Sequence, residues 1–235
     1  MHVDANGVPP RRGGQRPAPS AAPPCRAWSC RRRRPQDINA ASAGGSPPWE
    51  LLGFVDDSVE AGQSVGGRYP VLGGLDWLRV HATAAHAVVA VGASRVRQQI
   101  VARLAGVAVT FATLVHPSVL APDALQPPQL GEGALVLARA ILSVNTRIGR
   151  HAVVSRGCTV GHDSVLEDFV TLLPCVDISG NCVLEEGADV GTGCQVIQKL
   201  RVHAGTIVGA GAVVVRDLPP NCTAVGVPAR PIKGA

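Results

Sequence analysis

The chain has 235 residues, enough for one large domain or two small ones. Aromatic residues make up only 3% of it and glycine occurs 27 times, which argues against a core of large rings and favours a repetitive β architecture. The formal net charge of +5 comes from residues 1–48, where eight Arg stand against Asp4 and Asp37. The remainder is close to neutral, so we expect no nucleic-acid partner.

No apolar run reaches the length of about 18 residues that a membrane-spanning helix needs, and the first residues lack the apolar stretch of a signal peptide. We therefore expect no membrane partner. The seven cysteines are an odd number without paired spacing, which favours a reducing, cytoplasmic setting.

Residues 1–48 are rich in Pro, Arg, Gly, Ala and Ser and show neither a helical nor a strand period. This composition predicts a disordered tail that the folded part does not need.

Residues 49–115 predict a small α/β domain. Residues 51–55 and 87–91 are short apolar runs typical of buried strands. Residues 94–104 have apolar side chains at helical spacing, and 107–109 resume a strand. Strand, helix and strand in this order favour a Rossmann-like parallel unit.

From residue 130 the sequence repeats every six residues. Stepping by six meets an aliphatic residue at every position from Leu130 to Val214: Leu130, Val136, Leu142, Ile148, Val154, Val160, Leu166, Leu172, Ile178, Leu184, Val190, Val196, Val202, Val208 and Val214. An α-helix of 3.6 residues per turn cannot keep a period of six. The repeat therefore predicts a parallel β-helix in residues 116–235.

Each six-residue unit makes one short strand and a turn, and three units close a triangular coil. The aliphatic residues point inward, and small residues four positions later fill the corners. Glycine often follows the aliphatic, as at Gly149 and Gly161, where we expect it to relax the turn. Cys158, Cys182 and Cys194 fall on the inward small position and are interpreted as core residues.

His162 and Asp163 follow Gly161 at a turn of the predicted coils. A carboxylate beside an imidazole can orient the ring and increase its basicity, so this pair is a candidate general base. The alternative is a surface histidine beside an acidic residue. Zinc is a competing use of His151, His162 and His203, but these follow their register aliphatics at different offsets, so we expect no metal.

Asp56 and Asp57 end the first strand of the α/β domain, and Gly92 ends the second. Parallel sheets bind ligands at the carboxyl ends of their strands, so these residues are candidates for substrate binding. Ordinary turn chemistry is the alternative for the two aspartates.

The hexad run, the His162–Asp163 pair and the terminal residues 225–230 (VGVPAR) together resemble the hexapeptide-repeat acetyltransferases. Within them, the segments 53–57 (GFVDD), 70–74 (PVLGG), 90–92 (AVG) and 114–118 (LVHPS) are most similar to the sialic-acid and bacillosamine-type (NeuD/PglD-like) sugar acetyltransferases. The resemblance covers about residues 49–235.

This resemblance implies a mainly β fold: a left-handed parallel β-helix preceded by the small α/β domain. It implies a homotrimer with active sites between neighbouring prisms. Acetyl-CoA would be the donor, and a sugar amine or hydroxyl, nucleotide-linked or sialic-acid-like, the acceptor. His162 would act as general base with Asp163 beside it, and Thr171, Thr192 and Ala210 would line the coenzyme A groove.

The sequence departs from the family pattern at its start, where residues 1–48 lack the usual strand and Gly-Gly-His-Gly loop, so the α/β domain looks truncated. Thr171 stands where the family often has His, and Ser94-Arg95 replaces a usual Asn-Arg or Asp-Asn turn. Two alternatives stay open besides a zinc enzyme of the carbonic-anhydrase type: an acetyltransferase with another acceptor such as serine, and a non-catalytic β-helix scaffold.

Overall fold

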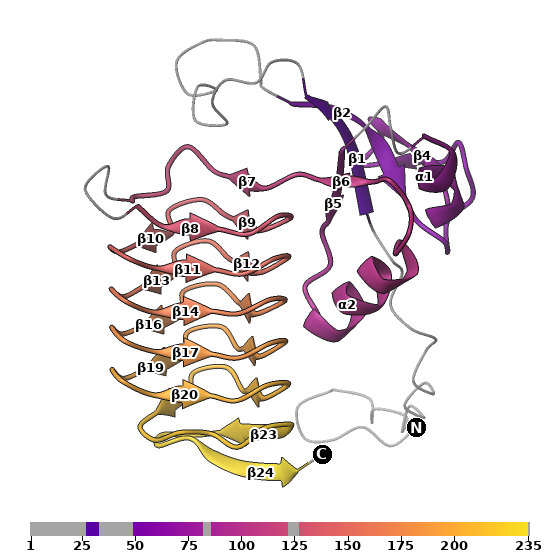
Figure 1. Cartoon of the computed structure of the whole chain (residues 1–235). Coiled ribbons are helices and arrows are strands. Elements are labelled where there is room, and N and C mark those ends of the chain that lie inside the picture. Colours follow the sequence, from indigo (N-terminus) through magenta and orange to yellow (C-terminus); the bar gives the residue numbers. More distant parts are fainter. Residues whose placement is uncertain (1–26, 33–48, 82–85, 122–126, 235) are drawn as a thin grey trace, which may run out of the picture.

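The computed structural model describes residues 27–32, 49–81, 86–121 and 127–234. An α/β unit comes first, and a tall stack of short strands follows it (Figure 1). The rest of the predicted tail, residues 1–26 and 33–48, lies outside the described residues.

The α/β unit is built on a six-stranded sheet with the order β3-β4-β2-β1-β5-β6. Its elements are β1 Ala27–Arg32, β2 Trp49–Val55, β3 Ser64–Val65, β4 Tyr69–Gly73, α1 Leu75–His81, β5 His86–Val89, α2 Ser94–Arg103 and β6 Thr110–Phe111. Strands β5 and β6 run parallel and are joined through α2, as the sequence predicts. The strand expected at 107–109 starts later, at Thr110.

Strand β1 differs from the prediction for residues 1–48, which placed no strand there. It pairs antiparallel with β2 on one side and with β5 on the other. Its backbone thereby satisfies hydrogen-bonding groups that β2 and β5 would each leave open along one edge. The apolar period of the sequence does not report this, because the strand is specified by its neighbours in the sheet.

The stack is a triangular prism, since each strand pairs in parallel with the strand 18 residues later, as Ile141 does with Thr159. We name its three sheets in chain order. Face 1 holds β8 Gln129–Leu130, β11 Arg147–Ile148, β14 Val165–Leu166, β17 Val183–Leu184 and β20 Arg201–Val202. Face 2 holds β7 Leu114–Val115, β9 Leu135–Val136, β12 Val153–Val154, β15 Thr171–Leu172, β18 Asp189–Val190, β21 Ile207–Val208, β23 Cys222–Val225 and β24 Arg230–Gly234. Face 3 holds β10 Ile141–Leu142, β13 Thr159–Val160, β16 Asp177–Ile178, β19 Gln195–Val196 and β22 Val213–Val214.

The coil is left-handed. In Figure 1 the strands of face 1 run from left to right in front, the chain returns behind them, and successive coils descend. Together with the parallel pairing, this confirms the predicted left-handed parallel β-helix. Right-handed crossovers are the rule between parallel strands, so composition and spacing alone could not have given this sense.

The hexad register sets the core of the prism. Every register aliphatic from Val136 to Val214 is at most 2% exposed, and Leu130 packs against the same cluster from the first coil. The inward cysteines are fully buried, and their thiols donate to carbonyl oxygens at 3.1 Å for Cys158, 3.2 Å for Cys182 and 2.8 Å for Cys194. Burial raises the pKa of all three thiols, to about 11 at Cys158.

The turns use glycine differently from our expectation. The left-handed backbone conformation falls on the third residue after the register aliphatic, as at Asn145 (φ 54°) and Asp163 (φ 59°). The glycine that directly follows the aliphatic is needed for close approach instead. A Cβ on Gly161 would lie 2.5 Å from the backbone nitrogen of Gly180 in the next coil. These glycines therefore let the corners of successive coils stack.

Candidate functional site

His162 and Asp163 lie on the turn between β13 and β14, at the corner between face 3 and face 1. The Nδ1 atom of His162 is 2.8 Å from Oδ2 of Asp163, and the two side chains are 57% and 42% exposed. With Nδ1 engaged by the carboxylate, the Nε2 atom is available to a reacting group. This geometry suits a general base.

Asn145, one coil earlier at the same corner, orients Asp163. Its Nδ2 donates to Oδ1 of Asp163 at 2.7 Å. The hydrogen bonds from Asn145 and then from His162 lower the pKa of Asp163, which keeps this carboxylate ionised. The sequence analysis missed Asn145. Stepping back 18 residues from Asp163 would have found it.

Gly180, one coil later, leaves space for the imidazole. A Cβ on Gly180 would lie 2.5 Å from Nε2 of His162 and 2.7 Å from Cε1. The other members of this column, Val144 and Gln198, carry side chains. The sequence analysis missed Gly180 as well, although the same step of 18 residues leads to it.

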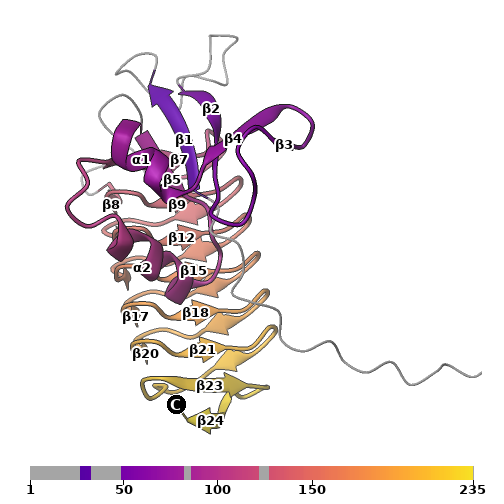
Figure 2. The ribbon, with the colours of Figure 1, turned by 90° about the vertical axis from the view of Figure 1, so that its right-hand side faces the viewer.

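Thr171 and Gly92 are brought together, but inside the contact between α2 and the prism. Figure 2 looks onto face 2, with α2 lying against it. Thr171 is 2% exposed, and its Oγ1 donates to the carbonyl oxygen of Gly92 at 3.0 Å. The side chain of Thr171 is therefore turned toward the α/β unit, away from the open groove expected for coenzyme A.

Arg97 of α2 holds this contact. It is 1% exposed, and burial lowers its pKa to about 10. Its guanidinium donates to carbonyl oxygens of two prism corners, His151 at 2.7 Å and Phe169 at 2.7 Å. It also donates to the carbonyl of Gly92 at 3.1 Å and to Oγ1 of Thr171 at 2.9 Å. The loop after β5 is thus fixed to the prism.

Thr192 and Ala210 are exposed and stack on one another at the corner between face 2 and face 3. The backbone of Gly211 donates to the carbonyl of Thr192 at 2.8 Å, which joins the two coils at this point. His162 occupies a different corner of the same protomer. Within one chain, these two predicted coenzyme A residues and the candidate base therefore do not meet.

Asp56 and Asp57 make structural contacts. Oδ1 of Asp56 accepts hydrogen bonds from the backbone and hydroxyl of Ser58, at 2.9 and 2.6 Å. Oδ1 of Asp57 accepts from the backbone nitrogen of Leu75, the first residue of α1, at 2.8 Å, and its Oδ2 pairs with Arg103 at 2.7 Å. The turn chemistry held open as an alternative is thus present at both residues.

A cavity of about 560 Å³ lies between the α/β unit and the upper part of face 2. We call it the Gly92 cavity. It is lined mostly by apolar residues: Val88, Ala90, Val91, Gly92, Leu114, Val115, His116, Pro117, Leu135, Val136, Leu137, Val153 and Ser155. Of the predicted substrate-binding residues Gly92 lines it, and Asp56 and Asp57 do not.

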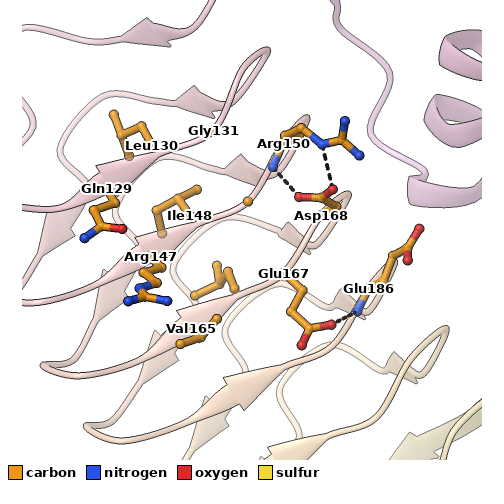
Figure 3. Close-up of a pocket in the computed structure, with 12 residues that line it drawn as sticks. Gln129, Leu130, Gly131, Arg147, Ile148, Arg150, Val165, Glu167, Asp168 and Glu186 are labelled. Atoms are coloured by element: carbon orange, nitrogen blue, oxygen red, sulfur yellow. Dashed lines mark hydrogen bonds and ion pairs between the residues drawn. The ribbon is translucent and has the colours of Figure 1, made fainter. Parts of the chain in front are cut away.

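A second depression, also of about 560 Å³, follows the outer surface of face 1 (Figure 3). The residues drawn there include Arg150, whose Nε is 2.8 Å from Oδ2 of Asp168, and Glu167, which accepts from the backbone nitrogen of Glu186 at 3.1 Å. None of the predicted site residues lines this depression, and several of its charged groups are already engaged with each other.

The three histidines considered for zinc lie in different surroundings. His151 is buried between Phe111 and Phe169, and His203 is 3.1 Å from Glu185 on face 1. Among residues 27–32, 49–81, 86–121 and 127–234, no group of three His, Cys, Asp or Glu side chains could hold a metal ion. No helix within the same ranges is long and apolar enough to span a membrane.

The sequence profile of the PglD N-terminal domain matches residues 37–104. The chain is 33% identical over 188 residues to GDP-perosamine N-acetyltransferase from Escherichia coli O157:H7, covering 77% of this chain and 82% of that protein. The chain belongs to the hexapeptide-repeat sugar acetyltransferase family. This confirms the resemblance read from the hexads, the His-Asp pair and the α/β segments.

Solved structures of this acetyltransferase family have the same fold. PerB from Caulobacter crescentus, in complex with CoA and GDP-perosamine, is 33% identical, with a TM-score of 0.68 over 76% of this chain and 86% of that one. The acetyltransferase domain of PglB from Neisseria gonorrhoeae is 32% identical, with a TM-score of 0.69 over 76% and 85%. Serine acetyltransferase from Salmonella typhimurium is 35% identical, but only over 36% of this chain and 34% of that protein.

Proposed function

We propose that the chain transfers the acetyl group of acetyl-CoA to the amino group of a nucleotide-linked amino sugar, with His162 as the general base. The observation that carries this is the His162–Asp163 pair, 2.8 Å apart on an exposed turn of a sugar-acetyltransferase fold. The acceptor and donor classes rest on relatives named for N-acetylation of GDP-perosamine and solved with CoA.

The chemistry needs a base at one atom. The amine nitrogen of the sugar attacks the thioester carbonyl carbon of acetyl-CoA, and a C–N bond forms. The C–S bond breaks, and coenzyme A leaves as a thiolate that takes up a proton. His162 removes the proton that the attacking nitrogen loses, at its Nε2 atom, because Nδ1 already faces Asp163. Asp163 stabilises the imidazolium that forms.

The position of the two candidate regions favours a site shared between protomers. His162 lies at the corner between face 3 and face 1, whereas the Gly92 cavity covers face 2. In a triangular prism, a corner and the opposite face point in opposite directions. We propose that the Gly92 cavity of one protomer holds the sugar, with Asp56 and Asp57 shaping the nearby loops, and that a neighbouring protomer contributes His162.

Exposed aliphatic side chains support a homotrimer. They gather on face 3 and its two edges, at Leu137, Ile141, Leu173, Ile197 and Val215, each 39% to 43% exposed. Apolar surface of this kind is typical of a subunit interface. Thr192 and Ala210 lie along the same edge, where we propose that they contact coenzyme A, while Thr171 acts by holding Gly92. We place the reaction in the cytoplasm, which suits the five free cysteines of the described residues.

The test is acetyl-CoA-dependent thiol release by the full chain with a panel of acceptors. The panel holds GDP- and UDP-linked amino sugars, the same nucleotide sugars without the amine, and L-serine. We expect release only with an amino sugar, and the N-acetyl product by mass spectrometry. His162→Ala should lower kcat by about 10²–10⁴-fold and leave acetyl-CoA affinity nearly unchanged.

His203→Ala is the matched control, because His203 also faces a carboxylate, that of Glu185, but on the surface of face 1. It should retain parental turnover. Transfer to L-serine alone would favour the serine-type alternative, and no release with any acceptor would favour the scaffold. A His162→Ala turnover within threefold of the parent would remove His162 from the mechanism.

A further inference from the structure

We propose that Asn145 is a positioning residue for the general base, acting on His162 through Asp163. The inference rests on the proposed function of His162. Three side chains from two successive coils form one chain of hydrogen bonds: Nδ2 of Asn145 to Oδ1 of Asp163 at 2.7 Å, and Nδ1 of His162 to Oδ2 of Asp163 at 2.8 Å.

The backbone explains why these groups meet. Asn145 and Asp163 have the same left-handed conformation, with φ of 54° and 59°, at equivalent points of coils 18 residues apart. Their side chains therefore leave the backbone in the same direction, separated by the coil spacing of about 4.8 Å. At that separation an amide donor and a carboxylate acceptor are within hydrogen-bond reach.

The contact matters because the Asp163 side chain is 42% exposed. A carboxylate at such a site rotates among several orientations in water, and only some present an oxygen to Nδ1 of His162. Asn145 occupies Oδ1 and so leaves Oδ2 for the ring. A ring that donates its Nδ1 proton to Oδ2 keeps a lone pair on Nε2, which is the form a general base needs.

Gly180 acts from the opposite side of the ring. A Cβ at this position would lie 2.5 Å from Nε2 of His162, so the imidazole lies directly against the backbone of the next coil. The ring is thus held between an anchored carboxylate on one side and a position without a side chain on the other. Both supports come from coils other than the one that carries His162.

An asparagine at this turn has a second explanation, because asparagine tolerates the left-handed conformation better than most residues. Asn181 separates the two explanations. It lies in the same column one coil later, has φ of 61° and is exposed. Within the described residues, the Asn181 side chain makes no hydrogen bond or ion pair. A purely conformational role would make Asn145 and Asn181 equivalent.

The experiment compares Asn145→Gly with Asn181→Gly in the full chain. Glycine accepts the left-handed conformation at both positions, so each variant loses only the side chain. We expect Asn145→Gly to lower kcat about tenfold, the value of one hydrogen bond to a charged group, with the KM for acetyl-CoA within about twofold. Asn181→Gly should match the parent. Asn145→Asp keeps the shape but opposes two carboxylates, and should lose at least as much turnover as Asn145→Gly.

A second readout needs no substrate. The ring nitrogens of ¹⁵N-labelled His162 report by NMR which nitrogen carries the proton. We expect mainly the Nδ1–H form in the parent and in Asn181→Gly, and a mixture in Asn145→Gly. Equal kcat in the two glycine variants with an unchanged ring spectrum would overturn the inference. A parent that transfers no acetyl group would refute the proposed function instead, while the spectra still decide the role of Asn145.

Discussion

The two ring nitrogens of His162 have different surroundings, and this difference determines what each neighbour can contribute. Nδ1 faces the carboxylate of Asp163 at 2.8 Å, while Nε2 lies over the backbone at Gly180. Removing the carboxylate charge therefore weakens the base without removing it, whereas removing the ring removes the base altogether.

Asp163→Asn tests this distinction. Asparagine tolerates the φ of 59° at this position, so the turn should keep its shape. We expect kcat to fall by less than in His162→Ala. The rise of kcat with pH should move to lower pH, because the protonated ring loses a neighbouring negative charge.

The measurement is a pH–rate profile of the parent and of Asp163→Asn with the same acceptor. Asp76→Asn is the control, since Asp76 is an exposed carboxylate on α1 that pairs only with Arg79 nearby. A loss in Asp163→Asn as large as that in His162→Ala would mean that the carboxylate does more than support the ring.

At this scale the sequence predicts what is adjacent in it. His162 and Asp163 are neighbours, so the pair can be recognised without a structure. Asn145 and Gly180 are 17 and 18 residues away from His162, and they join the site only because each coil closes after 18 residues. The burial of Thr171 could not be predicted, because it depends on where α2 lies against face 2.

At the scale of elements, the corner between face 1 and face 2 carries a buried histidine. The ring of His151 stacks on Phe169 with centroids 5.2 Å apart and meets the edge of Phe111 at 4.6 Å. Within the described residues its Nδ1 is buried without a hydrogen-bond partner. Burial, assisted by the positive charges of Arg97 and Arg150, lowers the pKa of His151 to about 4.

This shift predicts how stability changes with pH. The unfolded chain takes up a proton at His151 near pH 6.5, whereas the folded chain does so only near pH 4. The free energy of unfolding should therefore fall as the pH drops through this window, by about 1.4 kcal/mol per pH unit from this group. Above pH 6.5 the group should contribute no pH dependence.

His151→Phe removes the titrating group and the unpartnered nitrogen. Phe169 shows that phenylalanine adopts the left-handed conformation at this corner, with φ of 62°. Urea unfolding at pH 7.5 and pH 5 should give a loss of stability that is about 2 kcal/mol smaller in His151→Phe than in the parent. His81→Phe, at the exposed end of α1, is the control. Parallel pH curves for the parent and His151→Phe would contradict the prediction.

The elements themselves could be predicted in proportion to their periodicity. The hexads locate the register of the prism because every aliphatic step is paid in burial, from Val136 to Val214. Strand β1 has no such period and was missed, since it is specified by the two strands that it joins. The role of the glycines after the aliphatics depends on contacts between coils, as at Gly161.

At the scale of the whole molecule, the candidate base and the Gly92 cavity are on opposite sides of the prism. If each active site joins His162 of one protomer to the Gly92 cavity of another, two different inactive variants can restore each other. If each site is built within a single protomer, they cannot, because every protomer in the mixture carries one defect.

His162→Ala and Gly92→Phe form the test pair. Gly92 has open space where a Cβ would stand and lines the cavity, so phenylalanine there should fill the acceptor site without disturbing the backbone. Each variant alone should be inactive. Co-expressed in equal amounts, they should recover about a quarter of parental activity, because a random closed trimer joins an intact base to an intact cavity at one site in four.

The control for this experiment is the same two proteins purified separately and mixed in the cold, where subunits that do not exchange should stay inactive. A matched pair with both substitutions in one chain, co-expressed with an equal amount of the parent, should also give about a quarter of its sites intact if base and cavity come from different protomers, and half if they come from the same one. Activity absent from the first mixture and near half in the second would place the complete site within one protomer.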